Sequence, residues 1–597
     1  MSSSSLLSSP TVGRRERPSP APTAMPSTPT GVLERLTVAH LAYGLLVVVA
    51  LVARSIGLGS RPLAPAEAEA ALAAWQLSQG LGPAADAGTP LLLSLQTLLF
   101  FLAGGSDFLA RLAPNLAAAA LPLALWRWRT WVGHRPALLA ALLLTFSPLV
   151  NAFARRADGT AFVLLGLTLA LAGWGQVERR ERAGWRWLLA GVGLMLIAGA
   201  AAPAALLGLA LVMGLSRRQA SADVPPPTWG DALPGLVLVV VGGTVFLTRL
   251  SALGLMALNW SEWLQAFVWQ PQAWLWGLVR LLGDEPLLVL LGTAATLWLW
   301  RWPQPTPARR LGQAGLVLLF VAVLQGPSAA GTRAVATVLL AVPAALALAR
   351  FWRRRRHLTV HAAWPAEWPV FVAVLSILLI VAALALFGYT FTLLRVQLLL
   401  FALTLLVAVL FVGLFTYLAG WRPALLLGGA VGLVFLGAYN LAATWGLAFD
   451  ATPPRYAALY AVETRPAVRD LAVTVGDLGR RRHGERWSLP VTLVSGSASD
   501  ATLQWYLRRA PSLRVVPAVG GAEAGPLVVA PATAEPALSA AYAGQRFGVF
   551  TSWQPQRGTS QQQLAWMLYR VAPWDLPTAD VVLWADINLL TLTEPTP

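Results

Sequence analysis

The sequence contains no cysteine and only five histidines among its 597 residues. Without cysteine, the chain has no disulfide, no thiolate nucleophile and no cysteine-ligated metal site. So few histidines also argue against a histidine-rich metal site, and we expect no cofactor. A divalent metal held by carboxylates is compatible with the sequence, but no ligand cluster supports one.

Charged residues are scarce as well. They make up 12% of the chain, whereas an average soluble domain has about 25%. Hydrophobic residues make up 57%, and the mean hydropathy is +0.62. Apolar runs of about 17 to 25 residues match the hydrocarbon core of a bilayer. The pattern predicts a mostly α-helical, multi-pass protein of the cell membrane. About thirteen transmembrane helices are expected near residues 37–56, 107–126, 136–152, 160–177, 187–201, 203–216, 232–249, 285–301, 311–326, 332–350, 368–388, 396–418 and 423–447.

The arginines orient these helices. The net charge is +17, but most arginines fall in short turns, where basic residues set membrane topology. We therefore expect no nucleic-acid partner. The arginine clusters in these turns all lie on one side of the membrane only if 187–216 crosses it twice and 91–104 lies along its surface. As one long kinked helix, 187–216 would change the parity of every later span. The favoured arrangement puts the N-terminus in the cytoplasm and everything after residue 447 outside.

Three domains follow from these patterns. Residues 1–35 indicate a disordered cytoplasmic tail, rich in Ser, Pro and Thr. Residues 36–447 form the transmembrane domain, and residues 448–597 form a small extracytoplasmic α/β domain. In this last domain, strands are predicted at 490–495, 513–518, 526–530, 546–551 and 580–587, and helices at 464–480, 500–510, 534–543 and 559–570.

Two long loops face outward, 57–106 and 250–284. The first carries Glu67 and Glu69, which do not share a helix face because they are two residues apart. The second is rich in tryptophan, a residue that prefers the membrane–water interface. Most of these tryptophans are expected to be membrane anchors, although aromatic faces also suit a groove for a lipid or a sugar.

A third outward feature is the turn within 146–160, where Arg155, Arg156 and Asp158 interrupt the basic-inside pattern. Ionisable groups at that depth are costly. One interpretation is a local salt bridge, with Asp158 capping the next helix. The other is a site in which arginine holds a phosphate.

Group transfer at the outer face is the chemistry that fits these residues. A carboxylate of the first loop would take a proton from an acceptor hydroxyl. Arginine would stabilise the charge that develops on a phosphate leaving group. Glu67 is the first choice for the base or for a residue that positions the acceptor, and Glu69 is the other catalytic candidate. Arg155 and Arg156 are the choices for the phosphate, oriented by Asp158.

Several motifs resemble the polyprenyl-phosphate-dependent glycosyltransferases of the GT-C fold, particularly the family 39, protein mannosyltransferase-like group. PAEAEAALAAWQLSQG is similar to a segment that begins Asp-Glu-Ala in that group, with Ala66 and Glu67 on the acidic pair. GGSDFLARLAPNL and SPLVNAFARRAD resemble two further segments, the second placing Arg156 and Asp158 on an Arg-x-Asp pair. The C-terminal half looks like the tail of the flippase-activity-associated membrane proteins of glycosylation clusters.

The resemblance implies a hexosyltransferase that takes a sugar from a polyprenyl-phosphate donor and passes it to a glycan, lipid or protein acceptor. Two positions depart from the pattern, because Ala66 replaces the aspartate and Phe153 an earlier arginine. A catalytically weak or inactive scaffold for lipid-linked glycan export is therefore the alternative. A transporter is disfavoured, because no inverted repeat is apparent in the sequence.

Overall fold

The computed structural model of the chain describes residues 37–82, 88–217, 226–301, 306–354, 368–389, 420–449, 462–496, 500–520, 524–534, 541–554 and 574–590, with short pieces between 402 and 417 and between 536 and 566. The contacts divide the chain into a small unit, Met1–Ala42, and a large unit, Tyr43–Pro597. The predicted tail at 1–35 lies outside the described residues, and the predicted domain boundary at 447 stays a prediction.

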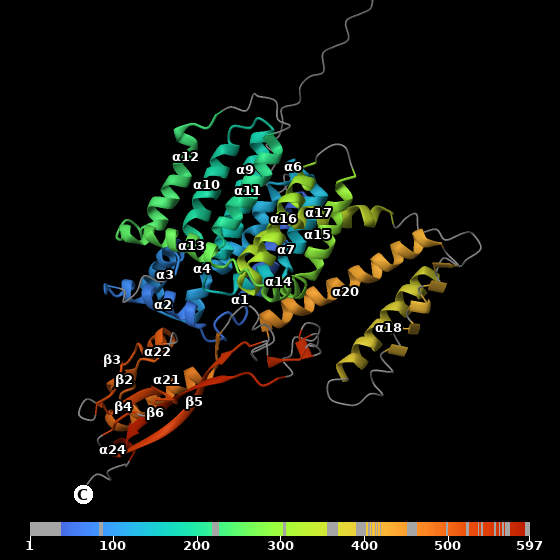
Figure 1. The fold of residues 1–597 in the computed structure, drawn as a ribbon. Coiled ribbons are helices and arrows are strands. Elements are labelled where there is room, and N and C mark those ends of the chain that lie inside the picture. Colours follow the sequence, from blue (N-terminus) through green and yellow to red (C-terminus); the bar gives the residue numbers. More distant parts are fainter. Residues whose placement is uncertain are drawn as a thin grey trace, which may run out of the picture. The chain divides into compact units, whose positions relative to one another are not determined.

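Apolar helices make up the larger part of the described chain (Figure 1). A backbone in lipid has to satisfy its hydrogen bonds internally, and the helix does so within one segment. Among the described residues, six helical stretches are long and apolar enough to cross a membrane: Val38–Ser55, Asp107–Val132, Thr160–Glu178, Pro307–Leu324, Ala330–Phe351 and Pro423–Gly446. The helices α7 (His134–Thr145) and α8 (Pro148–Ala154) add a seventh if the pair, bent by 61°, is one span. The chain is thus a multi-pass membrane protein, but the predicted count of about thirteen spans is not confirmed.

Most of the other predicted spans are helices too, although shorter ones. The stretch 187–216 consists of two helices, α10 (Gly184–Ala198) and α11 (Ala202–Arg217), rather than one kinked helix. The predicted span at 396–418 lies largely outside the described residues. The remaining helices of this part are α1 (Val38–Ser55), α2 (Pro65–Ser78), α3 (Pro90–Ala103), α4 (Asp107–Ala119), α5 (Leu121–Trp126), α6 (Arg129–Val132), α9 (Thr160–Glu178), α12 (Trp229–Val237), α13 (Gly254–Gln265), α14 (Pro271–Asp284), α15 (Pro286–Leu299), α16 (Pro307–Leu324), α17 (Ala330–Arg354), α18 (Trp368–Tyr389) and α20 (Trp421–Phe449).

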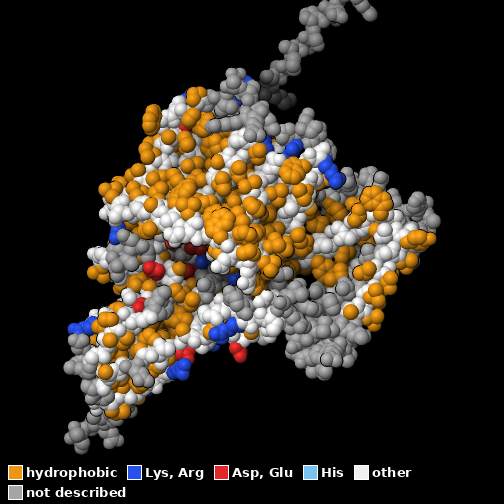
Figure 2. All heavy atoms as spheres, in the orientation of Figure 1, with side chains coloured by type: hydrophobic (Ala, Val, Ile, Leu, Met, Phe, Trp, Pro, Cys, Tyr) orange, Lys and Arg blue, Asp and Glu red, His pale blue; other side chains and the backbone are white. Residues whose placement is uncertain are grey.

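Glycines let α9 and α10 pack closely along their length. A Cβ on Gly173 of α9 would lie 2.4 Å from the backbone nitrogen of Leu188 on α10. A Cβ on Gly191 of α10 would lie 2.5 Å from the carbonyl oxygen of Gly166. Small residues of this kind permit backbone contact between membrane helices, where van der Waals packing drives association. Figure 1 shows α9, α10 and α12 side by side, and buried Leu, Val and Ala residues form the core among these helices. On the face shown in Figure 2, hydrophobic side chains cover most of the surface over the helices, as a lipid-facing surface requires.

The C-terminal part contains a six-stranded mixed sheet in the order β1-β5-β6-β4-β2-β3. Its strands are β1 (Val462–Thr464), β2 (Val491–Val494), β3 (Leu513–Val516), β4 (Leu527–Pro531), β5 (Tyr542–Ser552) and β6 (Thr578–Asp586). β2 runs parallel to β3 and β4, and the other neighbours are antiparallel. Helix α22 (Asp500–Leu507) connects β2 to β3, because parallel neighbours need a crossover. Helix α21 (Ala467–His483) contributes Val468, Leu471 and Val475 to the core beside the sheet. All five predicted strands are present, and β1 is additional.

The helix predicted at 534–543 is wrong. Tyr542 and Ala543 begin β5, where they pair with Asp586 and Ala585 of β6, and residues 536–538 are not helical. Pro536 has no N–H to donate within a helix, and pairing with β6 decides the rest. The helix predicted at 559–570 lies mostly outside the described residues.

Candidate active site

Glu67 lies at the start of α2, the helix that follows the first span. Its side chain folds back to accept a 2.9 Å hydrogen bond from the N–H of Ala64, the residue before the helix. The same carboxylate forms a two-point ion pair with Arg111 of α4, with Oε2 2.6 Å from Nη2 and Oε1 3.1 Å from Nε. Oε1 also accepts a 2.6 Å bond from the N–H of Ala157. Each carboxylate oxygen therefore accepts two hydrogen bonds, and Glu67 is only 2% exposed.

This environment keeps Glu67 ionised. Burial by itself would raise the pKa of Glu67, because it disfavours the charged form. The charge and hydrogen bonds of Arg111, together with the N–H groups of Ala64 and Ala157, outweigh burial and lower the pKa. A carboxylate of low pKa that is saturated with donors is a poor proton acceptor. Through its bond from the N–H of Ala157, Glu67 instead links α2 to the turn at residues 155–159. Its role as base stays a prediction.

Glu69, two residues further along α2, has the opposite environment. Its side chain is exposed and lines a cavity of about 490 Å³. Ala66, at the position where the resemblance expects an aspartate, lines the same cavity. The expected difference between the two glutamates follows from helix geometry, because residues two apart point to different faces.

Arg155 is held away from this cavity by backbone carbonyls. Its Nη1 donates to the carbonyl oxygens of Arg54 and Ile56, at 2.6 and 2.9 Å, and its Nη2 to that of Gly57 at 3.0 Å. These carbonyls belong to the end of α1 and the turn that follows, where the last carbonyls of a helix lack partners within it. Arg155 is not among the residues that line the cavity. Its predicted role in phosphate binding stays untested.

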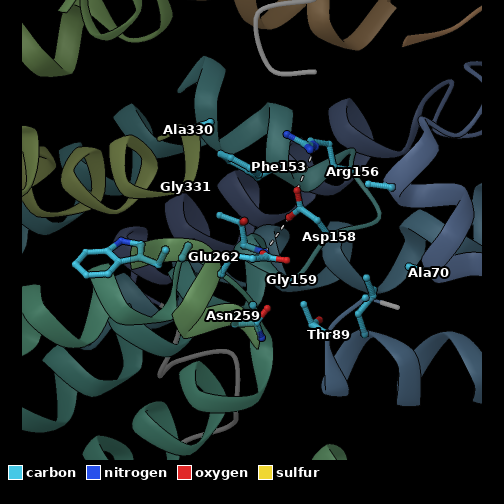
Figure 3. A pocket seen from close by; sticks show the side chains of 18 of the residues that line it. Ala70, Thr89, Phe153, Arg156, Asp158, Gly159, Asn259, Glu262, Ala330 and Gly331 are labelled. Atoms are coloured by element: carbon cyan, nitrogen blue, oxygen red, sulfur yellow. Dashed lines mark hydrogen bonds and ion pairs between the residues drawn. The ribbon is translucent and has the colours of Figure 1, made fainter. Parts of the chain in front are cut away.

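Arg156 and Asp158 lie together at the cavity wall. Nε of Arg156 is 3.1 Å from Oδ2 of Asp158, and Oδ1 of Asp158 accepts a 2.9 Å bond from the N–H of Thr160. Asp158 therefore caps α9, as one interpretation of the sequence expected, and it also holds an arginine that faces the cavity. Burial raises the pKa of Asp158, and Arg156 and Thr160 offset only part of that effect. Figure 3 shows Arg156 and Asp158 pointing toward one another beside Phe153.

The cavity collects residues from six parts of the chain, which include the segments 88–92 and 199–201. Besides α2 and the turn before α9, it is lined by the N-terminus of α17 and by one face of α13. Residues Ala330 to Thr332 line the cavity and carry the first N–H groups of α17, a helix of 25 residues. Such groups have no carbonyl partner within the helix and carry a partial positive charge. The volume lies within the range of about 300–1,000 Å³ that is usual for small-molecule sites.

The tryptophan-rich second loop contributes one tryptophan to this wall. Among its tryptophans, Trp260 and Trp269 are exposed, and Trp274 donates its indole N–H to the carbonyl of Val268. Trp263 instead lines the cavity, together with Asn259 and Glu262 of the same helix. The sequence allowed that a minority of the tryptophans would line a groove, but composition did not indicate which one.

Arg111 and Asp107 were not among the predicted site residues, although both lie in the GGSDFLARLAPNL segment. Arg111 holds Glu67, and it also donates to the carbonyls of Leu58, Arg61 and Pro62. Asp107, four residues earlier on α4, accepts bonds from three side chains of the C-terminal part: Arg469 at 2.6 Å, Trp505 at 2.8 Å and Tyr506 at 2.8 Å. The sequence did carry a signal for both residues, because Asp107 and Arg111 are charged, lie one helical turn apart and stand beside an apolar run.

The C-terminal part is thus bound to the segment that carries Glu67. The hydroxyl of Tyr506 accepts from the N–H of Leu63, and Trp505 is fully buried against Phe100 at a ring distance of 5.6 Å. Burial raises the pKa of Glu463 on β1, and this carboxyl also feels the charges of Arg61, Glu67 and Arg156. Within the described residues, no group of three or more His, Cys, Asp or Glu side chains is arranged to hold a metal ion. The expectation of no cofactor stays a prediction.

Comparisons with known proteins agree with this architecture. Residues 87–226 match the family model described as dolichyl-phosphate-mannose-protein mannosyltransferase. No curated protein matches the chain. Among solved structures, ArnT from Cupriavidus metallidurans bound to undecaprenyl phosphate is similar at 18% identity and a TM-score of 0.50, over 93% of this chain and 99% of that one. The oligosaccharyltransferase AglB from Archaeoglobus fulgidus, in complex with an inhibitory peptide and a dolichol-phosphate, matches at 13% identity and a TM-score of 0.41, over 82% and 69%.

The similarity to ArnT establishes the fold. The predicted architecture, a GT-C-like transmembrane domain followed by a small C-terminal α/β domain, is confirmed. The family match covers less than half of the chain, within the segment that includes α4, α8 and α9. That segment carries Arg111, Arg156 and Asp158.

Proposed function

We propose that this protein is an integral-membrane glycosyltransferase that moves a sugar from a polyprenyl-phosphate donor to an acceptor hydroxyl outside the cytoplasm. The observation that carries the proposal is the cavity in which Glu69, the Arg156–Asp158 pair and the N-terminus of α17 meet. The shared fold with ArnT, which was crystallised with undecaprenyl phosphate, supports the choice of donor. The proposed orientation has the N-terminus in the cytoplasm and the cavity on the opposite side.

The donor phosphate would bind between Arg156 and the start of α17. Arginine offers a planar set of donors that suits phosphate oxygens, and Asp158 fixes its orientation through Nε. A helix N-terminus adds unpaired N–H groups and a favourable dipole. Both groups would stabilise the negative charge that grows on the phosphate as it leaves.

Glu69 is the residue proposed as the general base, and Glu67 is a positioning residue. In the transfer, Glu69 takes the proton of the acceptor hydroxyl while the acceptor oxygen forms a bond to C1 of the sugar. The bond between C1 and the phosphate oxygen breaks, and polyprenyl phosphate leaves with the electron pair. Glu67 holds the N–H of Ala157, between Arg156 and Asp158, and so fixes the turn that carries both side chains.

The test is sugar transfer by the purified protein in liposomes, with radiolabelled polyprenyl-phosphate monosaccharides as donors. Glu69→Gln and Arg156→Ala are each expected to lower kcat at least about 100-fold, the usual contribution of a general base or a charge-stabilising group. Glu181→Gln is the matched control, because Glu181 forms an exposed ion pair with Arg179 away from the cavity. Transfer in the presence of EDTA tests the expectation of no metal.

The departure at Ala66 is tested in the same assay. Restoring the acidic residue with Ala66→Asp is expected to raise the rate of a weak enzyme. Binding of polyprenyl phosphate by the unaltered protein, without transfer from any donor even after this change, would support the scaffold alternative. Transfer that is unaffected by Glu69→Gln and by Arg156→Ala would contradict the assigned roles.

A further inference from the structure

The wall of the cavity formed by α13 has the character of a binding surface for a polyhydroxyl ring. Glu262 and Trp263 follow Asn259 by three and four residues, so each of them lies next to Asn259 on the helix surface. All three line the cavity. Figure 3 labels Asn259 and Glu262 together with Asp158 and Gly159, which line the same cavity from the turn before α9.

Asn259 gives the clearest indication that a ligand binds here. It is 6% exposed, and its Nδ2 has no hydrogen-bond partner among the residues that the structure describes. An unsatisfied buried amide costs about 1–3 kcal/mol, and such groups in a native protein usually have a reason. The side chain lies at the cavity, where a hydroxyl oxygen of a bound molecule would accept the missing bond.

Trp263 is held in a fixed orientation beside Asn259. Its indole N–H lies 3.3 Å from the hydroxyl oxygen of Thr332, and its carbonyl accepts a 3.0 Å bond from Gln325. Gln325 in turn accepts from Thr332 at 2.8 Å, and Phe267 meets the Trp263 ring edge-on at 5.2 Å. An aromatic face carries partial negative charge, so it attracts the weakly positive C–H groups of a pyranose ring. Fixing the ring in advance lowers the entropy that binding would otherwise cost.

We infer that Asn259, Glu262 and Trp263 form a subsite for the pyranose ring of the donor, with the indole against the ring and the amide and carboxylate on its hydroxyl groups. This subsite rests on the proposed function. It divides the cavity into a charged half for the phosphate, at Arg156 and the start of α17, and an α13 half that recognises the sugar. A carboxylate repels phosphate, so Glu262 does not suit the phosphate of the donor. It accepts hydrogen bonds from hydroxyl groups well.

The two halves predict different effects on two ligands, bare undecaprenyl phosphate and polyprenyl phosphates that carry mannose, glucose or galactose. For the unaltered protein in nanodiscs, at least one sugar-bearing lipid should bind more tightly than the bare lipid. Asn259→Ala and Trp263→Ala should weaken that lipid roughly tenfold, about the loss of one good hydrogen bond or ring contact, and leave the bare lipid unchanged. Arg156→Ala should weaken both lipids.

Two further variants exclude a purely structural effect. Trp263→Phe keeps an aromatic face and should restore most of the binding. Trp260→Ala removes an exposed tryptophan of the same helix, which does not line the cavity, and should change neither affinity. Equal loss for both lipids in Asn259→Ala and Trp263→Ala, or no preference for any sugar in the unaltered protein, overturns the subsite and leaves the proposed function standing. Failure to bind either kind of lipid removes the proposed function and the subsite together.

Discussion

The two long loops, 57–106 and 250–284, are held in place by different means. The first is held by Asp107 and Arg111, which lie one turn apart on α4, directly after the loop. Arg111 forms charge-assisted bonds to Glu67, and Asp107 forms them to the C-terminal part. In the second, α13 lines the cavity with Asn259, whose Nδ2 has no partner within the described part of the chain, and exposes Trp260. Buried charges survive only when they are fully paired. The part of the first loop around Glu67 is therefore a scaffold, whereas α13 in the second loop has polar groups available for recognition.

Replacing Arg111 should have the largest effect on stability. Arg111→Ala leaves the buried Glu67 carboxylate without its ion pair, and breaking a buried pair in this way costs about 3–5 kcal/mol. Thermal unfolding of the protein in detergent measures the loss. Arg546→Ala is the control, because the Arg546 side chain is 69% exposed in its pair with Asp580, and such pairs contribute about 1 kcal/mol or less. Equal shifts of Tm would show that the Arg111 pair does not hold the loop.

Asp107→Asn should have the next largest effect, and the effect should be local. The carboxylate accepts bonds from Arg469, Trp505 and Tyr506, and a hydrogen bond to a charged group contributes about 1.5–3 kcal/mol. Hydrogen exchange should become faster in α21 and α22 while the membrane helices keep their protection. Asp477→Asn, in an exposed pair on α21, should leave exchange unchanged. Protection that stays equal in both variants would mean that other contacts fix the C-terminal part.

The Glu67 carboxylate should make stability depend on pH. Its pKa is lowered in the folded protein from an ordinary value of 4.5, so its contribution is complete above that value and is lost as the pH falls through the folded pKa. Between about pH 6 and pH 3, the unaltered protein should lose more stability than Glu67→Gln. Tm measured against pH gives the difference. Parallel curves for the two proteins would contradict the lowered pKa.

Changes on α13 should have the smallest effect on stability. Asn259→Ala removes an Nδ2 that no described residue contacts by a hydrogen bond, so the unfolding free energy should change by less than about 1 kcal/mol. Trp260→Ala, at an exposed site, should have a similarly small effect on the unfolding free energy. A large drop in Tm for Asn259→Ala alone would make Asn259 a structural residue and would remove the contrast between the two loops.

The sequence predicted the positions of helices and strands better than it predicted which of them pair or pack together. Apolar length located the helices, and the short apolar runs at 490–495 and 580–587 became β2 and β6, because both patterns reflect burial of the segment itself. The helix predicted at 534–543 failed where pairing of β5 with β6 overrode local preference. Each predicted span was expected to cross the membrane. Several of the helices at those positions have only 10–17 residues, so the predicted number of crossings is not confirmed.

For the candidate site, the sequence indicated which segments matter and the tertiary structure divided the work among their residues. The segments around Glu67 and Arg156 were singled out because charge is rare in so apolar a chain. Only the fold showed that Arg111 saturates Glu67, that Arg155 is held by carbonyls after α1, and that Glu69 lines the cavity. Composition and hydropathy therefore determined that this is a multi-pass helical protein, because transfer into lipid depends on each segment alone. The role of each charge was decided by which donors surround it in space, because a pKa and a binding site depend on neighbours that are distant in the chain.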